Sequence, residues 1–311
     1  MDDCYINKPL YTTETGIPIF SAKDSYIRNY DNIANDHNIK RASDQSNKPD
    51  TLHYLEESTV ELMLKYLSPG DKVLDIGVST GQLLEKVDME AKIGVQKYGV
   101  DIAVKALEIA KTKKIHVCLA KVEELPYKDN YFDMIVCTSV LEHVFNEYLA
   151  VENMLRVLRK GGILILRVPL NENLESYFDD AFPYEYEHVR SYSLFSLKGL
   201  FEKIFGQHIK EYKVEPYIDS AGNLFVHNIN ASVYKRLELI QENLYRPNTL
   251  FAKGINFFHK RTQHGRKIAE ALVVLYDVKS KLNKFFRASE EKDYRFINSA
   301  INIVVRKSGV Q

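Results

Sequence analysis

The sequence predicts an α/β protein built on a doubly wound, mostly parallel sheet. Short apolar runs alternate with longer stretches of helical periodicity through the first two thirds of the chain. This alternation is typical of parallel strands covered by helices on both faces. The first run, in "VLDIGVSTGQ", ends in a turn with two glycines, Gly77 and Gly81. Because ligands bind at the carboxyl ends of the strands in open α/β sheets, we expect a binding site at this turn.

The composition sets broad limits on function. The 311 residues are 45% hydrophobic and 27% charged, which is enough for a full core. Lys plus Arg equals Asp plus Glu at 42 each, so overall charge favours neither a nucleic acid nor a membrane surface as partner. Cys4, Cys118 and Cys137 lack the spacing of a zinc site or a disulfide framework. No segment has the ~20 apolar residues of a membrane span, and no secretory signal is recognised, so we expect a cytoplasmic protein.

The N-terminal part of the chain is predicted to precede the core. Residues 1–50 are polar, with a modest helical period in "DSYIRNYDNIANDHN", and are expected to be an extension or helical cap. Apolar residues then recur at helical spacing over residues 51–67, before "SPGD" ends the helix. This helix begins the core domain, which we assign to residues 51–227.

Five apolar runs are predicted to be core strands. Helical stretches such as "AVKALEIAKTKK" and "NEYLAVENMLRVLRKGG" separate them. Since the crossovers between parallel strands are right-handed, the result is a doubly wound sheet. The runs lie at residues 72–77, 97–102, 115–120, 131–137 and 162–168.

The regular alternation ends after Val168. An aromatic and acidic loop is followed by a predicted helix at residues 193–206 and a strand at 208–218. The final strand is predicted at 300–307, within a last core segment of residues 294–311.

Residues 228–293 separate the last two predicted strands. They are too many for a plain connection and have helical periodicity, so a helical insertion is expected. The insertion has 13 basic and 7 acidic residues, a net charge of +6. It is interpreted as a lid or homodimer element that meets an anionic substrate, or as a solvated helical surface.

The glycine turn limits the type of ligand. Gly77 and Gly81 permit positive φ and close approach, and a helix from about Gln82 offers unpaired N–H groups. A dinucleotide site needs G-x-G-x-x-G and a P-loop needs a Lys after its last glycine, and "GVSTGQ" has neither. The acidic Asp75 before the turn suits a ligand with a positive charge and no phosphate.

This stretch resembles motif I, D-x-G-x-G-x-G, of the class I S-adenosylmethionine-dependent methyltransferases. Asp75, Gly77 and Gly81 match the motif, and Ser79 replaces its middle glycine. "YGVDIAVKALEIAK" places Asp101 at the end of the second strand, 24 residues after Gly77, where a carboxylate can accept hydrogen bonds from ribose hydroxyls.

Two later segments extend the resemblance. "AKVEELPYKDNYFDMIVCTSVLEHV" is similar to the family's next two motifs and "RVLRKGGILILRVP" to its fifth-strand motif, so four ordered motifs cover residues 73–169. The resemblance implies a Rossmann-like sheet of seven strands, mostly parallel with the last antiparallel. It also implies S-adenosylmethionine as cofactor, S-adenosylhomocysteine as product and no required metal.

The resemblance also assigns the cofactor contacts. The segment from Lys121 to Glu124 should line the adenine, and the contact of the Asp that relatives commonly have at Lys121 is expected to be lost or taken over by Glu123. Thr138 and Ser139 should lie near the sulfonium. The implied cofactor-binding residues are Asp75, Gly77, Ser79, Gly81, Asp101, Ile102, Val122, Glu123, Thr138 and Ser139.

Catalytic candidates follow the fourth and fifth strands. "YEYEHVRSYS" resembles the family's H-V-R-x-[YF]-S stretch, so His188 is a candidate base with a pKa suited to neutral pH. Arg190 would orient it or bind an anionic acceptor, and His143 would begin the wall of the acceptor pocket. The alternative is structural: His188 and Arg190 would only fix the loop, and Glu142 and His143 would begin a solvated helix.

Several tyrosines are expected near the acceptor. Tyr26 and Tyr30 should fold over the site as part of the cap. Three more, in the loop after the fifth strand, could stack on a flat or sugar-like acceptor or pack on the sheet edge. These are Tyr184, Tyr186 and Tyr192.

The sequence therefore predicts a methyltransferase acting on oxygen or nitrogen of a small molecule, such as a metabolite, glycan precursor or natural product. An RNA methyltransferase that uses the basic insertion and a non-catalytic, cofactor-binding scaffold are the alternatives. A nicotinamide-dependent oxidoreductase is disfavoured because G-x-G-x-x-G is missing.

Overall fold

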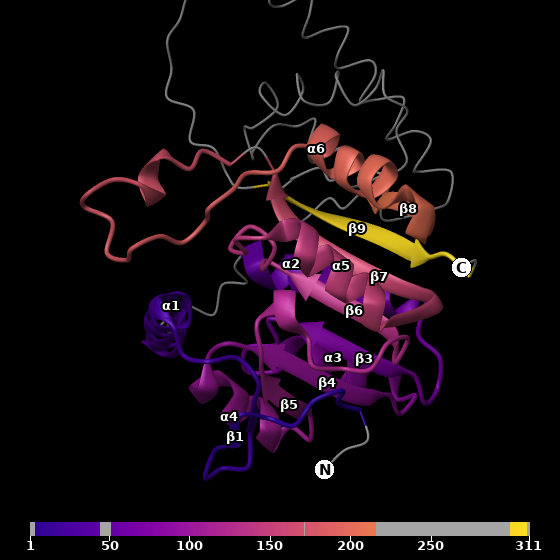
Figure 1. The fold of residues 1–311 in the computed structure, drawn as a ribbon, viewed down its shortest axis with the longest axis horizontal. Coiled ribbons are helices and arrows are strands. Elements are labelled where there is room, and N and C mark those ends of the chain that lie inside the picture. Colours follow the sequence, from indigo (N-terminus) through magenta and orange to yellow (C-terminus); the bar gives the residue numbers. More distant parts are fainter. Residues whose placement is uncertain (1–3, 44–50, 171, 216–298, 310–311) are drawn as a thin grey trace, which may run out of the picture.

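The computed structural model describes residues 4–43, 51–170, 172–215 and 299–309. The predicted insertion, 228–293, lies outside the described residues. Within them, the strands form one sheet of order β1-β2-β5-β4-β3-β6-β7-β9-β8 (Figure 1). The strands are β1 (Tyr11–Thr12), β2 (Pro18–Ile19), β3 (Lys72–Ile76), β4 (Gln96–Asp101), β5 (His116–Leu119), β6 (Phe132–Thr138), β7 (Leu158–Leu170), β8 (Ile209–Glu215) and β9 (Ser299–Lys307).

Helices cover both faces of the sheet. Val73 and Leu74 are consecutive in β3, so their side chains point to opposite faces, and each is buried in a different hydrophobic cluster. The cluster around Val73 includes apolar side chains of α1 to α4, and the cluster around Leu74 includes those of α5 and α6. The helices are α1 (Ser25–Ser43), α2 (Thr51–Leu64), α3 (Gln82–Ala91), α4 (Val104–Thr112), α5 (Glu147–Val157) and α6 (Leu194–Lys198).

The predicted doubly wound topology is confirmed. Strands β5, β4, β3, β6 and β7 are parallel neighbours, and β9 runs antiparallel between β7 and β8. From β3 the chain adds β4 and β5 on one side and then β6 and β7 on the other, so the direction of strand order reverses beside β3. The carboxyl ends of β3, β4 and β6 therefore meet at the switch point where α/β proteins bind ligands.

The sheet has two more strands than the seven expected. β1 and β2 come from the N-terminal extension, where Ile19 pairs with Leu119 at the edge of β5. Ile17 and Ile19 are buried there. Strands of two residues have no periodicity that distinguishes them from a loop, so the sequence predicts only a cap at this place.

Two boundaries differ from the predicted ones. The helix expected to continue through "RVLRKGG" ends at Val157, and β7 begins at once with Leu158, which pairs with Phe132 before a register shift. The helix expected at residues 193–206 is α6 followed by a π-helical segment, Gly199–Ile204. No helix in the described parts of the chain is both long and apolar enough to cross a membrane.

Candidate cofactor and acceptor site

The glycine turn joins β3 to α3 and has little room for side chains. Gly77 has φ +74°, and a Cβ there would lie 2.3 Å from the Cγ2 of Val140. Gly81 has φ +79°, and a Cβ there would lie 2.5 Å from the Cδ1 of Ile115. Both positions therefore require glycine for backbone conformation and for space.

Ser79 takes the place of a third glycine by adopting a left-handed conformation. Its φ is +47°, a region that costs a residue with a side chain roughly 1–2 kcal/mol. Its N–H donates a hydrogen bond of 2.8 Å to the Oδ2 of Asp101. This contact from the end of β4 helps to hold the turn in the conformation that the serine disfavours.

Asp101 lies at the centre of this arrangement. Its Oδ1 accepts hydrogen bonds from the N–H groups of Ile102 at 2.7 Å and Ala103 at 2.9 Å. Burial raises the pKa of Asp101, although the three backbone donors act in the opposite direction. A carboxylate has about four acceptor positions, so Asp101 can hold the turn and still accept from a ligand.

The ends of β3 and β6 complete the cofactor side. Asp75 is 2% exposed, one residue before the end of β3. Thr138 ends β6, and Ser139 follows it with φ +54° while its N–H donates to the carbonyl of Arg167 at 2.9 Å. These residues stand at the sheet edge where the resemblance predicts the methionine part of the cofactor.

The segment expected to line the adenine is tied to the N-terminal extension. The N–H of Lys121 donates to the Oγ of Ser21 at 2.9 Å, and the Lys121 ammonium pairs with Asp24. The neighbouring Glu123 has a buried Oε2 atom without a hydrogen-bond partner, and burial raises the pKa of its carboxyl. Lys121 thus anchors the extension, and the contact of Glu123 with the adenine stays a prediction from the resemblance.

Aromatic side chains of α1 cover the acceptor side. The ring of Tyr26 lies 4.9 Å from that of Tyr30 and 5.3 Å from that of Phe145, between centroids. Tyr30 contacts the rings of His143 at 5.2 Å and Tyr186 at 6.0 Å, and its hydroxyl donates to the carbonyl of Glu187. These ring contacts join α1 to His143 and Tyr186, and the role of α1 as a cap over the site stays a prediction.

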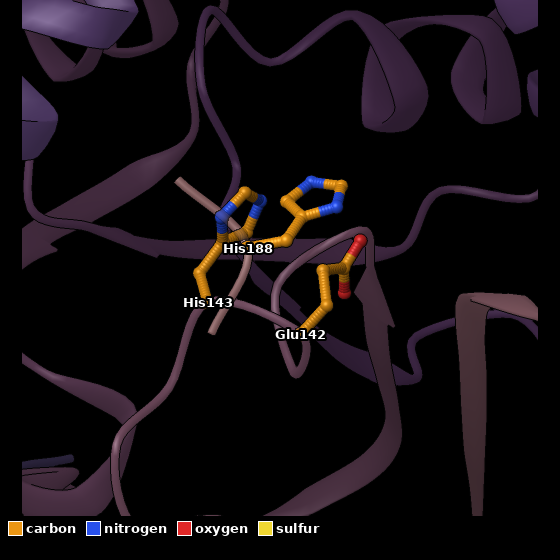
Figure 2. Close-up of side chains that lie close together, drawn as sticks. All are labelled: Glu142, His143 and His188. Carbon is orange, nitrogen blue, oxygen red and sulfur yellow. The ribbon is translucent and has the colours of Figure 1, made fainter. Parts of the chain in front are cut away.

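Three side chains converge beneath it, from two loops (Figure 2). Glu142 and His143 follow β6, and His188 comes from the loop after β7. One potential ligand atom of each lies within 4.8 Å of the others, and the two imidazole centroids are 4.6 Å apart. The structure therefore joins the two histidines that the sequence separates by more than 40 residues.

Glu172 holds His188 in position. Its Oε2 lies 2.5 Å from the Nδ1 of His188, and its Oε1 accepts from the hydroxyl of Tyr177 at 3.0 Å. Burial lowers the pKa of His188. The hydrogen bond to Glu172 and the nearby carboxylates together raise it by more, so the net shift of the pKa is upward. The sequence gives no signal for Glu172, which stands in the polar loop "NEN" after β7.

Other predicted site residues have structural partners. Arg190 donates to the carbonyls of Val144 and Phe145 and pairs with Glu147, so it fastens its loop to the start of α5 rather than orienting His188. Tyr192 is 4% exposed and donates to Glu147 at 2.8 Å.

Tyr184 is tied to the cap instead. Its hydroxyl donates to Asp36 of α1 at 2.8 Å. Of the three loop tyrosines, Tyr186 has ring contacts with Tyr30 and Phe145 of the aromatic layer. Phe145, which the sequence does not single out, contributes to that layer and is 56% exposed.

Part of the chain is similar to known methyltransferases. A family described as "Methyltransferase domain" matches residues 74–166, from β3 to β7. An uncharacterised protein of Methanocaldococcus jannaschii is 34% identical over 112 residues, covering 36% of this chain and 51% of the relative. The ubiquinone/menaquinone biosynthesis C-methyltransferase UbiE of Vibrio parahaemolyticus is 34% identical over 124 residues, covering 36% of this chain and 47% of the relative. The matched region thus spans about half the length of these relatives.

A solved structure resembles the chain over a longer range. It comes from the complex of the Haloferax volcanii Trm112 methyltransferase activator with a methyltransferase, with a TM-score of 0.51 and 15% identity. The match covers 93% of this chain and 100% of the other. At that identity the similarity concerns the fold.

Proposed function

Because residues 74–166 are a class I S-adenosylmethionine-dependent methyltransferase domain, we propose that this chain transfers a methyl group from S-adenosylmethionine to a small molecule. The observation that carries the proposal is the turn after β3, where Asp101 accepts from the N–H of Ser79. Gly77 and Gly81 of the same turn have positive φ and pack so closely against Val140 and Ile115 that neither position has room for a Cβ.

The proposed cofactor contacts follow from these positions. Asp101 accepts from a ribose hydroxyl with the acceptor position that its three backbone donors leave. Asp75 and the turn bind the methionine part, and Thr138 and Ser139 lie beside the sulfonium. Val122, Ile102 and Glu123 surround the adenine, since Lys121 is paired with Asp24.

The reaction is an in-line displacement that removes the positive charge from sulfur. It requires the acceptor to stand about 3 Å from the methyl group, with water excluded. We assign water exclusion and acceptor placement to the aromatic layer of α1, in particular Tyr26 and Tyr30. In the simplest version of the reaction, His188, held by Glu172, accepts the proton of a hydroxyl or ammonium acceptor.

The acceptor class is narrowed by this polar group. We propose oxygen or nitrogen as the acceptor atom, since an imidazole or carboxyl group can accept the proton that a hydroxyl or ammonium acceptor loses. The relative UbiE is named a C-methyltransferase, but that name describes UbiE and does not assign carbon as the acceptor atom of this chain. The alternative of an RNA acceptor depends on the basic insertion, which lies outside the described residues. A scaffold without catalysis would bind S-adenosylmethionine at the same turn but would not transfer the methyl group.

A thermal shift experiment tests the proposal. S-adenosylhomocysteine at 100 times its dissociation constant should stabilise the folded chain by about 2.7 kcal/mol, and NADH should not. Incubation with labelled S-adenosylmethionine and a panel of hydroxyl and amine metabolites should then identify the acceptor. Stabilisation by NADH alone would refute the proposal.

A further inference from the structure

The group of Glu142, His143 and His188 has features that general base catalysis does not require. Among the described residues, these three side chains are a set close enough to share one ion. Two imidazoles and one carboxylate are the ligands of many catalytic zinc and iron sites, which keep an open coordination position. Figure 2 shows the three side chains converging from two loops.

The partners of the two histidines fix their orientation. The Nδ1 of His143 lies 3.0 Å from the carbonyl of Glu187, and the Nδ1 of His188 lies 2.5 Å from the carboxylate of Glu172. Metal-binding histidines usually donate one ring N–H to a carbonyl or carboxylate, which presents the other nitrogen to the metal. Here both imidazoles have such an acceptor, so Nε2 is the nitrogen that each would offer.

Glu142 has a buried carboxylate oxygen that lacks a hydrogen-bond partner. The residue is 1% exposed, and its Oε2 atom is buried without a hydrogen-bond partner. An unpaired buried carboxylate oxygen is costly unless a cation or donor satisfies it.

We propose that Glu142, His143 and His188 bind a divalent transition-metal cation, with Zn²⁺ as the reference ion. Zinc binds imidazole and carboxylate ligands at about 2.0–2.2 Å, which separates tetrahedral ligands by roughly 3.4 Å. In the structure, one nitrogen of each imidazole and one carboxylate oxygen lie within 4.8 Å of one another, so side-chain rotations would be needed to bring the ligand atoms to that separation. Glu172 and the Glu187 carbonyl are positioning groups of this site.

The charges around the site are compatible with a cation. Glu142 and Glu172 provide two carboxyl groups, and Glu187 lies beside them. Arg167 is the basic group that faces Glu142, and its guanidinium donates to Thr59 at 3.2 Å. A bound cation would therefore lie among three carboxyl groups, two imidazoles and one arginine.

The cation gives the acceptor side a definite chemistry, and this part rests on the proposed function. A hydroxyl bound at the open position loses its proton to solvent because the cation lowers its pKa. The oxygen then forms a bond to the methyl carbon, and the electrons of the breaking C–S bond remain on sulfur as neutral S-adenosylhomocysteine. His188 is then a ligand and cannot accept the proton, so the cation replaces it as the activating group.

Metal binding can be measured without cofactor or acceptor. The full chain is treated with a chelator, desalted and titrated with Zn²⁺ by calorimetry and with Co²⁺ by visible absorption. We expect one equivalent of Zn²⁺ and Co²⁺ bands in the visible region. Glu142→Gln and His188→Asn should each weaken Zn²⁺ binding at least 100-fold, and Glu172→Gln should weaken it 10- to 100-fold.

Matched controls separate this site from other histidines. His116 lies on β5 and His208 before β8, both exposed, and His116→Asn and His208→Asn should leave Zn²⁺ binding unchanged. Near-UV circular dichroism in chelator checks folding of every variant. If Glu142→Gln does not fold, the Zn²⁺ affinities of His188→Asn and His208→Asn are compared, and weaker binding by His188→Asn alone supports the site.

Two results would overturn the site. One is the absence of any one-equivalent binding by the parent chain, and the other is equal binding by the parent, Glu142→Gln and His188→Asn. Either result would leave His188 as the proposed base. Because S-adenosylhomocysteine binding is measured separately, failure of the metal site and failure of the methyltransferase proposal are distinguishable.

Discussion

The Oδ2 of Asp101 accepts a hydrogen bond of 2.8 Å from the N–H of Ser79, which joins the end of β4 to the turn after β3. The same carboxylate accepts from two further N–H groups at the start of the β4–α4 loop. One side chain thus stabilises both loops between which the ribose is proposed to bind.

Replacement of this carboxylate should affect stability and binding together. Asp101→Ala leaves three backbone donors without their acceptor, so we expect a loss of about 1–3 kcal/mol in the free energy of unfolding. Affinity for S-adenosylhomocysteine should fall at least 10-fold, as measured by calorimetry on the folded fraction.

A carboxylate in a comparable role elsewhere is the control. Asp71 accepts from the N–H of Ser68 at 2.8 Å in the turn before β3, at the opposite end of that strand. Asp71→Ala should reduce stability while leaving cofactor affinity within about twofold. Equal loss of affinity in both variants would mean that the effect of Asp101→Ala is only structural.

Two glycines separate backbone strain from close packing. Gly70 and Gly77 both have positive φ, but a Cβ at Gly70 meets nothing within 4 Å, whereas at Gly77 it clashes with Val140. Gly70→Ala should therefore cost only the conformational strain, about 1 kcal/mol. Gly77→Ala should cost at least 2 kcal/mol more and weaken S-adenosylhomocysteine binding at least 10-fold, measured by urea denaturation and calorimetry. Similar stability of the two variants would contradict the packing of the turn.

The core fold was predictable because local patterns determine it. Each parallel strand is a short apolar run, and the glycine turn and Asp101 occupy the ends of consecutive strands. The strands β1 and β2 were not predictable, since two-residue strands depend on pairing with β5 far along the chain. The end of α5 was misplaced because "RVLRKGG" is compatible with either a helix or the start of β7.

The acceptor side was only partly predictable. His143 and His188 are expected from their motifs, but their proximity depends on how two loops pack. Glu172 acts through a contact with His188 that no spacing in the sequence reveals. The sequence shows that Lys121 stands where relatives commonly have Asp in the segment predicted to line the adenine. Its ion pair with Asp24 of the N-terminal extension becomes visible only in the structure.

The cap should depend on the Tyr30 hydroxyl. Tyr30→Phe removes the hydrogen bond to the carbonyl of Glu187 but keeps the ring contacts with Tyr26 and His143. We expect a loss of about 1 kcal/mol in urea denaturation. Tyr11 is 57% exposed, and Tyr11→Phe is the matched control with no expected change. Equal stability of both variants would show that the hydroxyl contact contributes nothing to the cap.

The buried thiols should make stability depend on alkaline pH. Burial raises the pKa of Cys118 to about 12, against roughly 8.5 in an unfolded chain. The unfolded chain therefore loses this proton first, so the stabilisation is complete below about pH 8.5 and is lost as pH rises toward 12. Between pH 7 and pH 9.5, one such thiol lowers the free energy of unfolding by about 1.4 kcal/mol.

Urea denaturation of the parent and of Cys118→Ala at both pH values measures this effect. The difference in stability between the two should shrink by that amount at pH 9.5. Native Cys118 should also resist alkylation at pH 8 and react in urea. A constant difference across this range, or rapid alkylation of the native thiol, would contradict the burial of Cys118.

The most direct test of the central claim is calorimetric titration of the folded chain with S-adenosylhomocysteine. One molecule should bind per chain, with at least 10-fold weaker binding in Asp101→Ala and unchanged binding in Asp71→Ala. No heat of binding by the folded parent chain, at ligand concentrations up to the millimolar range, would contradict the claim that the turn after β3 holds this nucleoside.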